Sequence, residues 1–273
     1  MLDPLLQLPI TSTLAQYSQG PTYYAARGTG DLLVLIHGSL CDLRYWRWQI
    51  NKLYDHCEVV SLSLPGYWPN NPSSAAYEFD LMNQVAAVAD VIDQKRQSGQ
   101  KIYVLGHSRG ALVATQYALQ HAPIDGLILA DPAFTVNEAP PALPVLGEAA
   151  SLLANGQDEQ GLALFIDAVS GKNTWRQMVG WFKTMVEDNA HTLIAQSREE
   201  LPVLGADRLS AFNQLPLLLI NGALSPKRYQ NSAEQLLKHL PHAQHALIPN
   251  ASHGMNLANP KAFNKALLNF MHS

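Results

Sequence analysis

The stretch Gly106-His107-Ser108-Arg109-Gly110 decides the fold of this chain. Residues 101–105 before it are typical of a buried strand, and residues 111–119 after it are typical of a helix. A Gly-x-Ser-x-Gly pattern between a strand and a helix predicts a sharp, strained turn that exposes the serine hydroxyl at the carboxyl end of a sheet. The small residues on either side of the serine let strand and helix approach closely. The stretch therefore indicates a nucleophile at Ser108.

Strand and helix patterns alternate on both sides of this turn. Apolar runs predict strands at residues 23–26, 32–36, 58–64, 101–105, 126–130, 216–220 and 246–248. Helical spacing of apolar residues predicts helices at 79–97, 111–119, 233–240 and 259–271. This order predicts an α/β fold with a mostly parallel central sheet and helices on both faces.

One long segment, from about residue 134 to 206, has no strand pattern. It opens with several prolines, and Trp175, Met178, Phe182 and Met185 follow at helical three- and four-residue spacings. An all-helical insertion between two strands predicts a cap over the carboxyl edge of the sheet. We therefore expect a first part of the core at 1–134, a helical cap at 135–205 and a second part of the core at 206–273.

Composition narrows the class of protein. The chain has 273 residues, 47% of them hydrophobic, and a formal net charge of -4. That supports one sizeable core, and the absence of Lys/Arg runs argues against nucleic-acid binding. No apolar stretch reaches the ~18 residues of a membrane helix, and the N-terminus does not resemble a secretory signal. Cys41 and Cys57 make no disulfide framework, so a reducing, cytoplasmic location is expected.

These features together resemble the α/β-hydrolase superfamily from about residue 22 to the end. The resemblance rests on ordered landmarks: His37-Gly38 after a strand, the 106–110 turn, the cap insertion, and His253 after the last strand. It implies nucleophilic chemistry on a small-molecule substrate without a cofactor. It does not imply a particular substrate, because this fold supports many reactions.

The groups that such a mechanism needs can be named. A serine hydroxyl requires a base, and His253 is the best candidate because it lies in a loop between the small residues Ser252 and Gly254. The attacked oxygen becomes negative and needs hydrogen-bond donors. The resemblance implies that the backbone N–H groups of Ser39 and Arg109 form this oxyanion hole.

The acid that supports the base departs from the family pattern. The family usually carries an Asp in the loop after the next-to-last strand, but residues 221–226 read Asn-Gly-Ala-Leu-Ser-Pro, with Ser225 about where the acid is expected. Some members carry the acid one strand earlier, which here is Asp131. We therefore expect a triad of Ser108, Asp131 and His253. Other interpretations stay open: Asp131 only caps a turn before Pro132, Ser225 assists a Ser108–His253 dyad, or the cap supplies the acid.

Other side chains have more modest expectations. His107 is expected to pack beneath the turn, His37 to hold the oxyanion loop, and the Arg109 guanidinium to lie on a helix surface. His239, His242 and His245 straddle a helix end and a strand start, so a metal site is not expected. Apolar residues near the active edge or in the cap are expected to line a substrate pocket: Leu40, Trp46, Phe134, Trp175, Trp181, Phe182 and Met255.

The sequence thus predicts a carboxylesterase-like serine hydrolase that acts on a small, largely apolar ester through an acyl-enzyme. Hydrolysis of a carbon–carbon bond or of a lactone would use the same groups. A third hypothesis, from a different class, is a non-catalytic small-molecule binding protein. It is motivated by the missing acid after Gly222.

Overall fold

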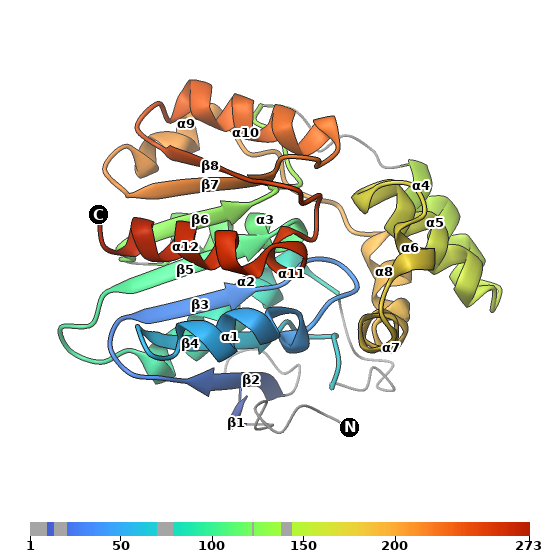
Figure 1. Ribbon diagram of the computed structural model, residues 1–273, viewed down its shortest axis with the longest axis horizontal. Coiled ribbons are helices and arrows are strands. Elements are labelled where there is room, and N and C mark those ends of the chain that lie inside the picture. The colour runs from blue at the N-terminus through green and yellow to red at the C-terminus, as the bar shows by residue number, and fades with distance from the viewer. Residues whose placement is uncertain (1–9, 14–20, 70–78, 122, 138–143) are drawn as a thin grey trace.

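The computed structural model describes residues 10–13, 21–69, 79–121, 123–137 and 144–273. Their strands form one eight-stranded sheet in the order β1-β2-β4-β3-β5-β6-β7-β8, with helices packed on it (Figure 1). The pairs β1–β2 and β2–β4 are antiparallel, and every other neighbouring pair is parallel. The predicted α/β fold with a mostly parallel sheet is confirmed.

Seven of these strands overlap the predicted apolar runs, and β1 was not predicted. The strands are β1 (Ile10–Thr13), β2 (Pro21–Arg27), β3 (Leu32–Ile36), β4 (Glu58–Ser63), β5 (Ile102–His107), β6 (Gly126–Ala130), β7 (Leu217–Gly222) and β8 (Gln244–Ile248). Every residue of β3 through β7 is buried, whereas most residues of β8, an edge strand, are not.

The helices of the core flank this sheet. They are α1 (Arg47–Leu53), α2 (Leu81–Lys95), α3 (Arg109–Gln120), α9 (Ala206–Leu209), α10 (Lys227–His239), α11 (Met255–Ala258) and α12 (Pro260–Met271), with 3-10 turns η1 (Leu43–Trp46) and η2 (Ser210–Phe212). Helix α10 begins at Lys227, directly after Pro226, and not at residue 233 as predicted. The prediction missed the first two turns because they are mainly polar, although the buried face already starts at Tyr229.

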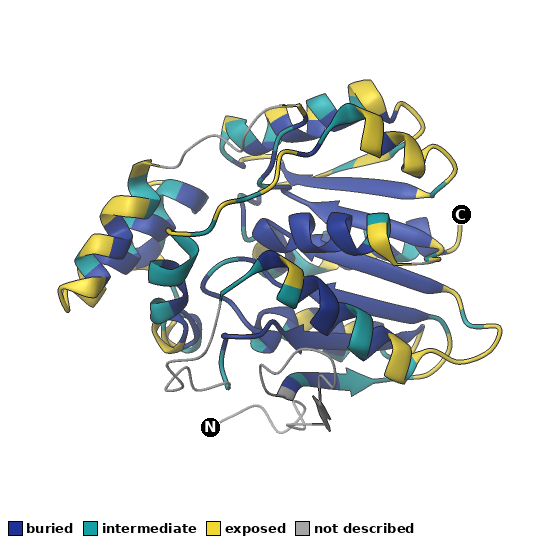
Figure 2. Ribbon diagram, turned by 180° about the vertical axis from the view of Figure 1, so that it is seen from behind, coloured by how far each residue is buried: buried dark blue, intermediate teal, exposed yellow. Residues whose placement is uncertain are grey.

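Alternation along the strands divides the core into two layers. Leu33 and Leu35 of β3 face the cluster that includes Ile50 of α1 and Phe263 of α12. Leu32, Val34 and Ile36 face the cluster that includes residues of α2, α3 and α10. Figure 2 shows the buried strands between helices whose outer sides are exposed. Both faces of the sheet are therefore covered, as a parallel sheet requires.

The stretch without strand patterns is helical where it is described. It contains α4 (Pro144–Ala154), α5 (Asp158–Ser170), α6 (Thr174–Gln177), α7 (Gly180–Asp188) and α8 (Ala190–Gln196), and Figure 1 shows these helices gathered at one side of the sheet. We propose that they form the cap within the division 1–134, 135–205 and 206–273; residues 138–143 of that cap lie outside the described residues. Within the described part of the chain, no helix is long and apolar enough to span a membrane.

Polar contacts at two places join the α7–α8 end of this helical group to the core. Near α3, the Arg109 guanidinium pairs with Glu199, just after α8. Near η1, Arg44 pairs with both Asp42 and Asp188, and the Asn189 amide donates to Asp42 at 2.8 Å. Because these groups are mostly buried, they fix the helical group in one position over the sheet.

Candidate active site

The turn between β5 and α3 holds Ser108 in a strained conformation. Its backbone angles are φ 55° and ψ -122°, in a region that non-glycine residues rarely adopt. The turn is held because the Ser108 N–H donates to the carbonyl of Ala130 at 2.9 Å, at the end of the neighbouring strand β6. The sequence pattern therefore produces the sharp strand–helix turn that it predicts.

The glycines of the turn are required by contact rather than by flexibility. A Cβ at Gly106 would lie 2.2 Å from the carbonyl oxygen of Gly110, and a Cβ at Gly110 would lie 2.2 Å from that of His37. Helix α3 thus begins directly against the end of β3. A Cβ at Gly38 would lie 2.9 Å from Cβ of Ser108, so the loop after β3 passes equally close to the serine.

A buried carboxylate meets the imidazole of His253. The His253 Nδ1 donates to Asp131 Oδ2 at 2.9 Å, which assigns the proton to Nδ1 and leaves Nε2 of the neutral ring as an acceptor. Asp131 follows β6 directly, with φ 41°, and its side chain is fully buried. The carboxylate that faces His253 therefore belongs to Asp131, in the loop after β6, and not to a residue of the loop after β7, where the family usually carries it.

Residues of the loop after β7 surround this carboxylate with donors. The Ser225 hydroxyl donates to Asp131 Oδ2 at 2.6 Å, and the Asn221 amide donates to Oδ1 at 2.7 Å. With His253, the Asp131 carboxylate thus accepts hydrogen bonds from three donors. These bonds stabilise its negative charge, which burial without partners would disfavour. The serine at the position where the family usually carries its acid thus hydrogen-bonds to Asp131.

The loop after β3 is held by His37. The backbone N–H of Leu64 donates to His37 Nε2 at 3.0 Å, so the ring proton is on Nδ1, which donates to the Gly38 carbonyl at 2.8 Å. Burial lowers the pKa of His37 to about 3, so the ring is neutral. The next residue, Ser39, lines the cavity described below, and Leu40 has φ 60°. The expected role of His37 as a support for this loop matches these contacts.

His107, just before the serine, packs beneath the site. Its Nε2 donates to the carbonyl of His253 at 2.8 Å, and its ring lies 4.5 Å from the His253 ring. Burial lowers its pKa well below the ordinary value, and the nearby His253 adds to the effect. The neutral ring of His107 therefore fixes the backbone that carries His253.

The Arg109 side chain differs from the expectation. It is buried, pairs with Glu199 at 2.6 Å, and also donates to Gln84. The expectation of a helix-surface position was wrong, because the helical group closes over the start of α3 and removes this position from solvent.

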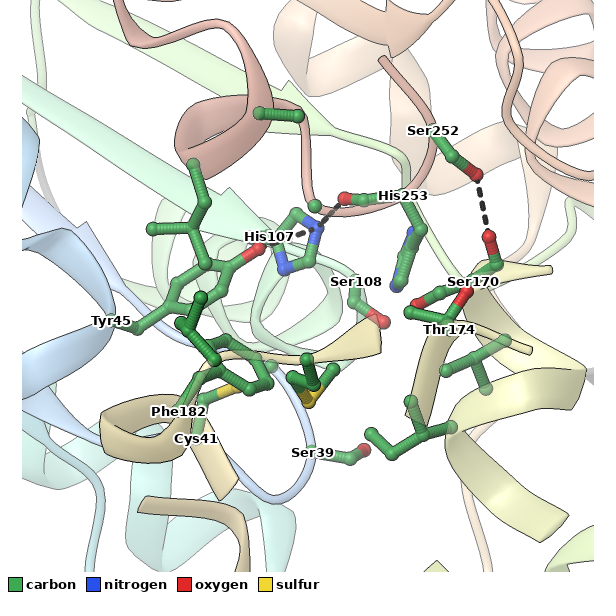
Figure 3. A pocket seen from close by; sticks show the side chains of 18 of the residues that line it. Ser39, Cys41, Tyr45, His107, Ser108, Ser170, Thr174, Phe182, Ser252 and His253 are labelled. Atoms are coloured by element: carbon green, nitrogen blue, oxygen red, sulfur yellow. Dashed lines mark hydrogen bonds between the residues drawn. The ribbon is translucent and has the colours of Figure 1, made fainter. Parts of the chain in front are cut away.

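A cavity of about 510 Å³ opens onto Ser108 and His253 (Figure 3). Its wall is mainly apolar and comes from the loop after β3, from α5, and from the segment between α6 and α7. The apolar lining includes Cys41, Tyr45, Phe165, Ile166, Val169, Met178, Val179, Trp181, Phe182 and Leu257. Polar side chains, among them Thr174 and Ser252, also reach it.

Only part of the predicted pocket lies at this cavity. Trp181 and Phe182 line it, while five other predicted residues are buried in the two core clusters: Leu40, Trp46, Phe134, Trp175 and Met255. These large side chains are needed to fill the space between sheet and helices. The lining residues Phe165, Ile166 and Val169 were missed, although their spacing marks one apolar face of α5.

The histidines considered for a metal site and the two cysteines are the remaining candidates from the sequence. The His245 Nε2 donates to Asn221 Oδ1 at 2.8 Å. In the part of the chain that the structure describes, no group of three or more His, Cys, Asp and Glu side chains could hold a metal ion. Cys41 and Cys57 are buried free thiols, and burial raises the pKa of both.

Comparison with known proteins relates this arrangement to named relatives. The pimeloyl-[acyl-carrier protein] methyl ester esterase of Yersinia enterocolitica is 29% identical over 260 residues, which cover 91% of this chain and 96% of that protein. The homologous enzyme of Pectobacterium carotovorum is 28% identical over 261 residues, covering 91% and 97%.

Solved structures share the fold at lower identity. The esterase of Exiguobacterium antarcticum has a TM-score of 0.75 at 22% identity, covering 94% of this chain and 98% of that one. The bromoperoxidase of Bacillus anthracis has a TM-score of 0.79 at 20% identity, covering 97% and 100%. The sequence profile described as Alpha/beta hydrolase family matches residues 33–266, most of the chain. The chain belongs to the alpha/beta hydrolase family.

Proposed function

We propose that this hydrolase cleaves esters with Ser108 as nucleophile, His253 as base and Asp131 as the acid that orients the base. One observation carries the proposal: the 2.9 Å hydrogen bond from His253 Nδ1 to Asp131 Oδ2, in a site where Ser108 and His253 face the same cavity. The strained turn at Ser108 supports it, because such strain persists where the surrounding structure is built to keep it.

The first half of the reaction forms an acyl-enzyme. Ser108 Oγ bonds to the ester carbonyl carbon while His253 Nε2 takes the hydroxyl proton, and the carbonyl oxygen becomes an oxyanion. The backbone N–H groups of Ser39 and Arg109 are the proposed donors to that oxyanion. His253 then gives its proton to the alcohol oxygen, the carbon–oxygen bond to the alcohol breaks, and the alcohol leaves.

The second half restores the enzyme. A water molecule gives a proton to His253 Nε2 as its oxygen bonds to the acyl carbon. The bond between that carbon and Ser108 Oγ then breaks, Oγ takes the proton back, and the carboxylic acid is released. Throughout, the Asp131 carboxylate stabilises the imidazolium that forms twice in each cycle.

The cavity wall supports an apolar acyl chain as the group that is bound. Its mainly apolar lining favours burial of hydrocarbon, at roughly 25 cal/mol for each Å² removed from water. The Yersinia relative is named for a methyl ester whose acyl group is attached to acyl-carrier protein. We therefore propose esters of an apolar acyl chain with a small alcohol, and include a carrier-bound acyl chain among the substrates to test.

A fluorophosphonate probe and a graded ester series test this function. Wild type is expected to be labelled at Ser108 and to hydrolyse methyl esters with an optimum acyl length. Ser108→Ala is expected to lose labelling and turnover while keeping its thermal unfolding temperature. Absence of wild-type labelling, under conditions that label a control serine hydrolase, would contradict the proposal and favour the binding protein.

A further inference from the structure

Tyr229 of α10 lies flat against the imidazole of His253. The two ring centroids are 4.0 Å apart and the planes are 11° from parallel, so the rings are stacked. Tyr229 is only 2% exposed. The contact is closer and more nearly parallel than that of His107, whose ring centroid lies 4.5 Å from His253 at 39°.

The tyrosine is itself held from both sides. The Arg228 guanidinium donates to the Tyr229 hydroxyl at 2.8 Å and also to the carbonyl of Ala168 in α5 at 3.3 Å. The Asn221 amide donates to the backbone carbonyl of Tyr229 at 3.3 Å and to Asp131 at 2.7 Å. The ring is thus fixed relative to both the carboxylate and the helical group.

The imidazole needs such a second support. The Cβ–Cγ bond and the hydrogen bond from Nδ1 to Asp131 hold one edge of the ring, and the opposite edge, which carries Nε2, can still tilt within the play of that hydrogen bond. Such tilting would move Nε2 away from the Ser108 hydroxyl. A flat aromatic surface at stacking distance restricts this tilting, because the two rings would have to separate before the imidazole could move.

We propose that Tyr229 is a positioning residue whose ring holds the plane of His253 so that Nε2 stays directed at Ser108. This role rests on the proposed function, in which His253 is the base. The ring performs it, and the hydroxyl, which hydrogen-bonds with Arg228 and with Ser108, anchors the ring. Burial raises the pKa of Tyr229 to about 12, so the hydroxyl is protonated at neutral pH.

Paired variants separate ring from hydroxyl. Tyr229→Phe keeps the stack but removes the hydroxyl contacts with Ser108 and Arg228, and its kcat for p-nitrophenyl butyrate is expected to fall less than that of Tyr229→Leu. Tyr229→Leu removes the stack, and kcat is expected to fall about 10- to 100-fold with KM unchanged, because small misplacements of a reacting group cost this much. The rate of fluorophosphonate labelling of Ser108 should fall in parallel.

A matched control accounts for lost packing. Tyr103 is also a buried tyrosine, but it lies at the amino end of β5, where its hydroxyl donates to Met271. Tyr103→Leu is expected to lower the unfolding temperature without lowering kcat at a temperature where it stays folded. If Tyr229→Leu does not fold, Tyr229→Met, which also lacks a ring, replaces it.

The outcomes separate the two proposals. Unchanged kcat and labelling in Tyr229→Leu, or an equal loss in Tyr229→Phe, would overturn the positioning role and leave the proposed function intact. A loss of kcat in Tyr103→Leu equal to that in Tyr229→Leu would also overturn it, because packing alone would then explain both. If wild type is not labelled at all, the proposed function fails and this role fails with it.

Discussion

At the scale of single residues, two loops form the surroundings of Asp131, the proposed acid. Asp131 carries the charge after β6, while Ser225 and Asn221 after β7 donate to it. The loop that carries the acid in other members therefore still takes part, as a hydrogen-bond donor. We therefore expect substitution of Asp131 to lower kcat much more than substitution of Ser225.

Asp131→Asn is expected to lower kcat by about 10⁴-fold, because an amide cannot stabilise the imidazolium or hold its tautomer. Ser225→Ala removes one of three donors to the charged carboxylate and is expected to lower kcat by no more than about 100-fold, because a hydrogen bond to a charged group is worth about 1.5–3 kcal/mol. Steady-state ester hydrolysis by both variants checks this. Equal losses would mean that Ser225 and Asp131 are equally important, contrary to the proposed triad.

A double variant can move the carboxylate from position 131 to position 225, where the family usually carries it. Ser225 Oγ and His253 Nδ1 contact the same oxygen of Asp131, at 2.6 Å and 2.9 Å, so a carboxylate at position 225 would enter the space beside that nitrogen. The double variant Asp131→Asn with Ser225→Asp is expected to recover at least about tenfold of the lost kcat. Ser225→Asn in the same background is the control, since it fills the space without a charge. Equal activity of the two double variants would refute the expectation.

At the scale of elements, the sequence predicts the features that depend on local residue patterns and misses those that depend on how distant elements pack. Seven of the eight described strands and the strand–helix turn depend on residues adjacent in sequence, and they could be predicted; the short edge strand β1 was missed. The pocket could not be predicted, because whether Trp46 or Phe165 meets the cavity depends on how α5 and α7 lie over the sheet. The buried position of Arg109 was missed for the same reason, since its partner Glu199 is distant in sequence.

That ion pair joins the start of α3 to the end of α8. Both side chains are 5% exposed, so removing one partner leaves the other charged and buried. Glu199→Gln is expected to lower the free energy of unfolding by about 3–5 kcal/mol, measured by urea denaturation. Asp93→Asn breaks the largely exposed Asp93–Arg96 pair and should change it little. If the two variants lose the same stability, the Glu199 pair does not anchor the helical group.

At the scale of the whole molecule, two buried neutral histidines couple stability to pH. Burial lowers the pKa of His37 to about 3 and that of His107 well below its ordinary value. Unfolding restores a pKa of about 6.5 to each ring, so the unfolded chain binds protons that the folded chain does not. The stability from these groups is fully present above about pH 6.5 and is lost as the pH falls toward the folded values.

The free energy of unfolding is therefore expected to fall between about pH 6.5 and 5, above the range where most carboxylates titrate, by up to about 1.4 kcal/mol per pH unit for each histidine. His37→Asn should remove its share of that slope, whatever its effect on stability at neutral pH, because asparagine does not titrate. Urea titrations at several pH values measure this, and an unaltered slope in His37→Asn would show that His37 is not the neutral, buried group described here.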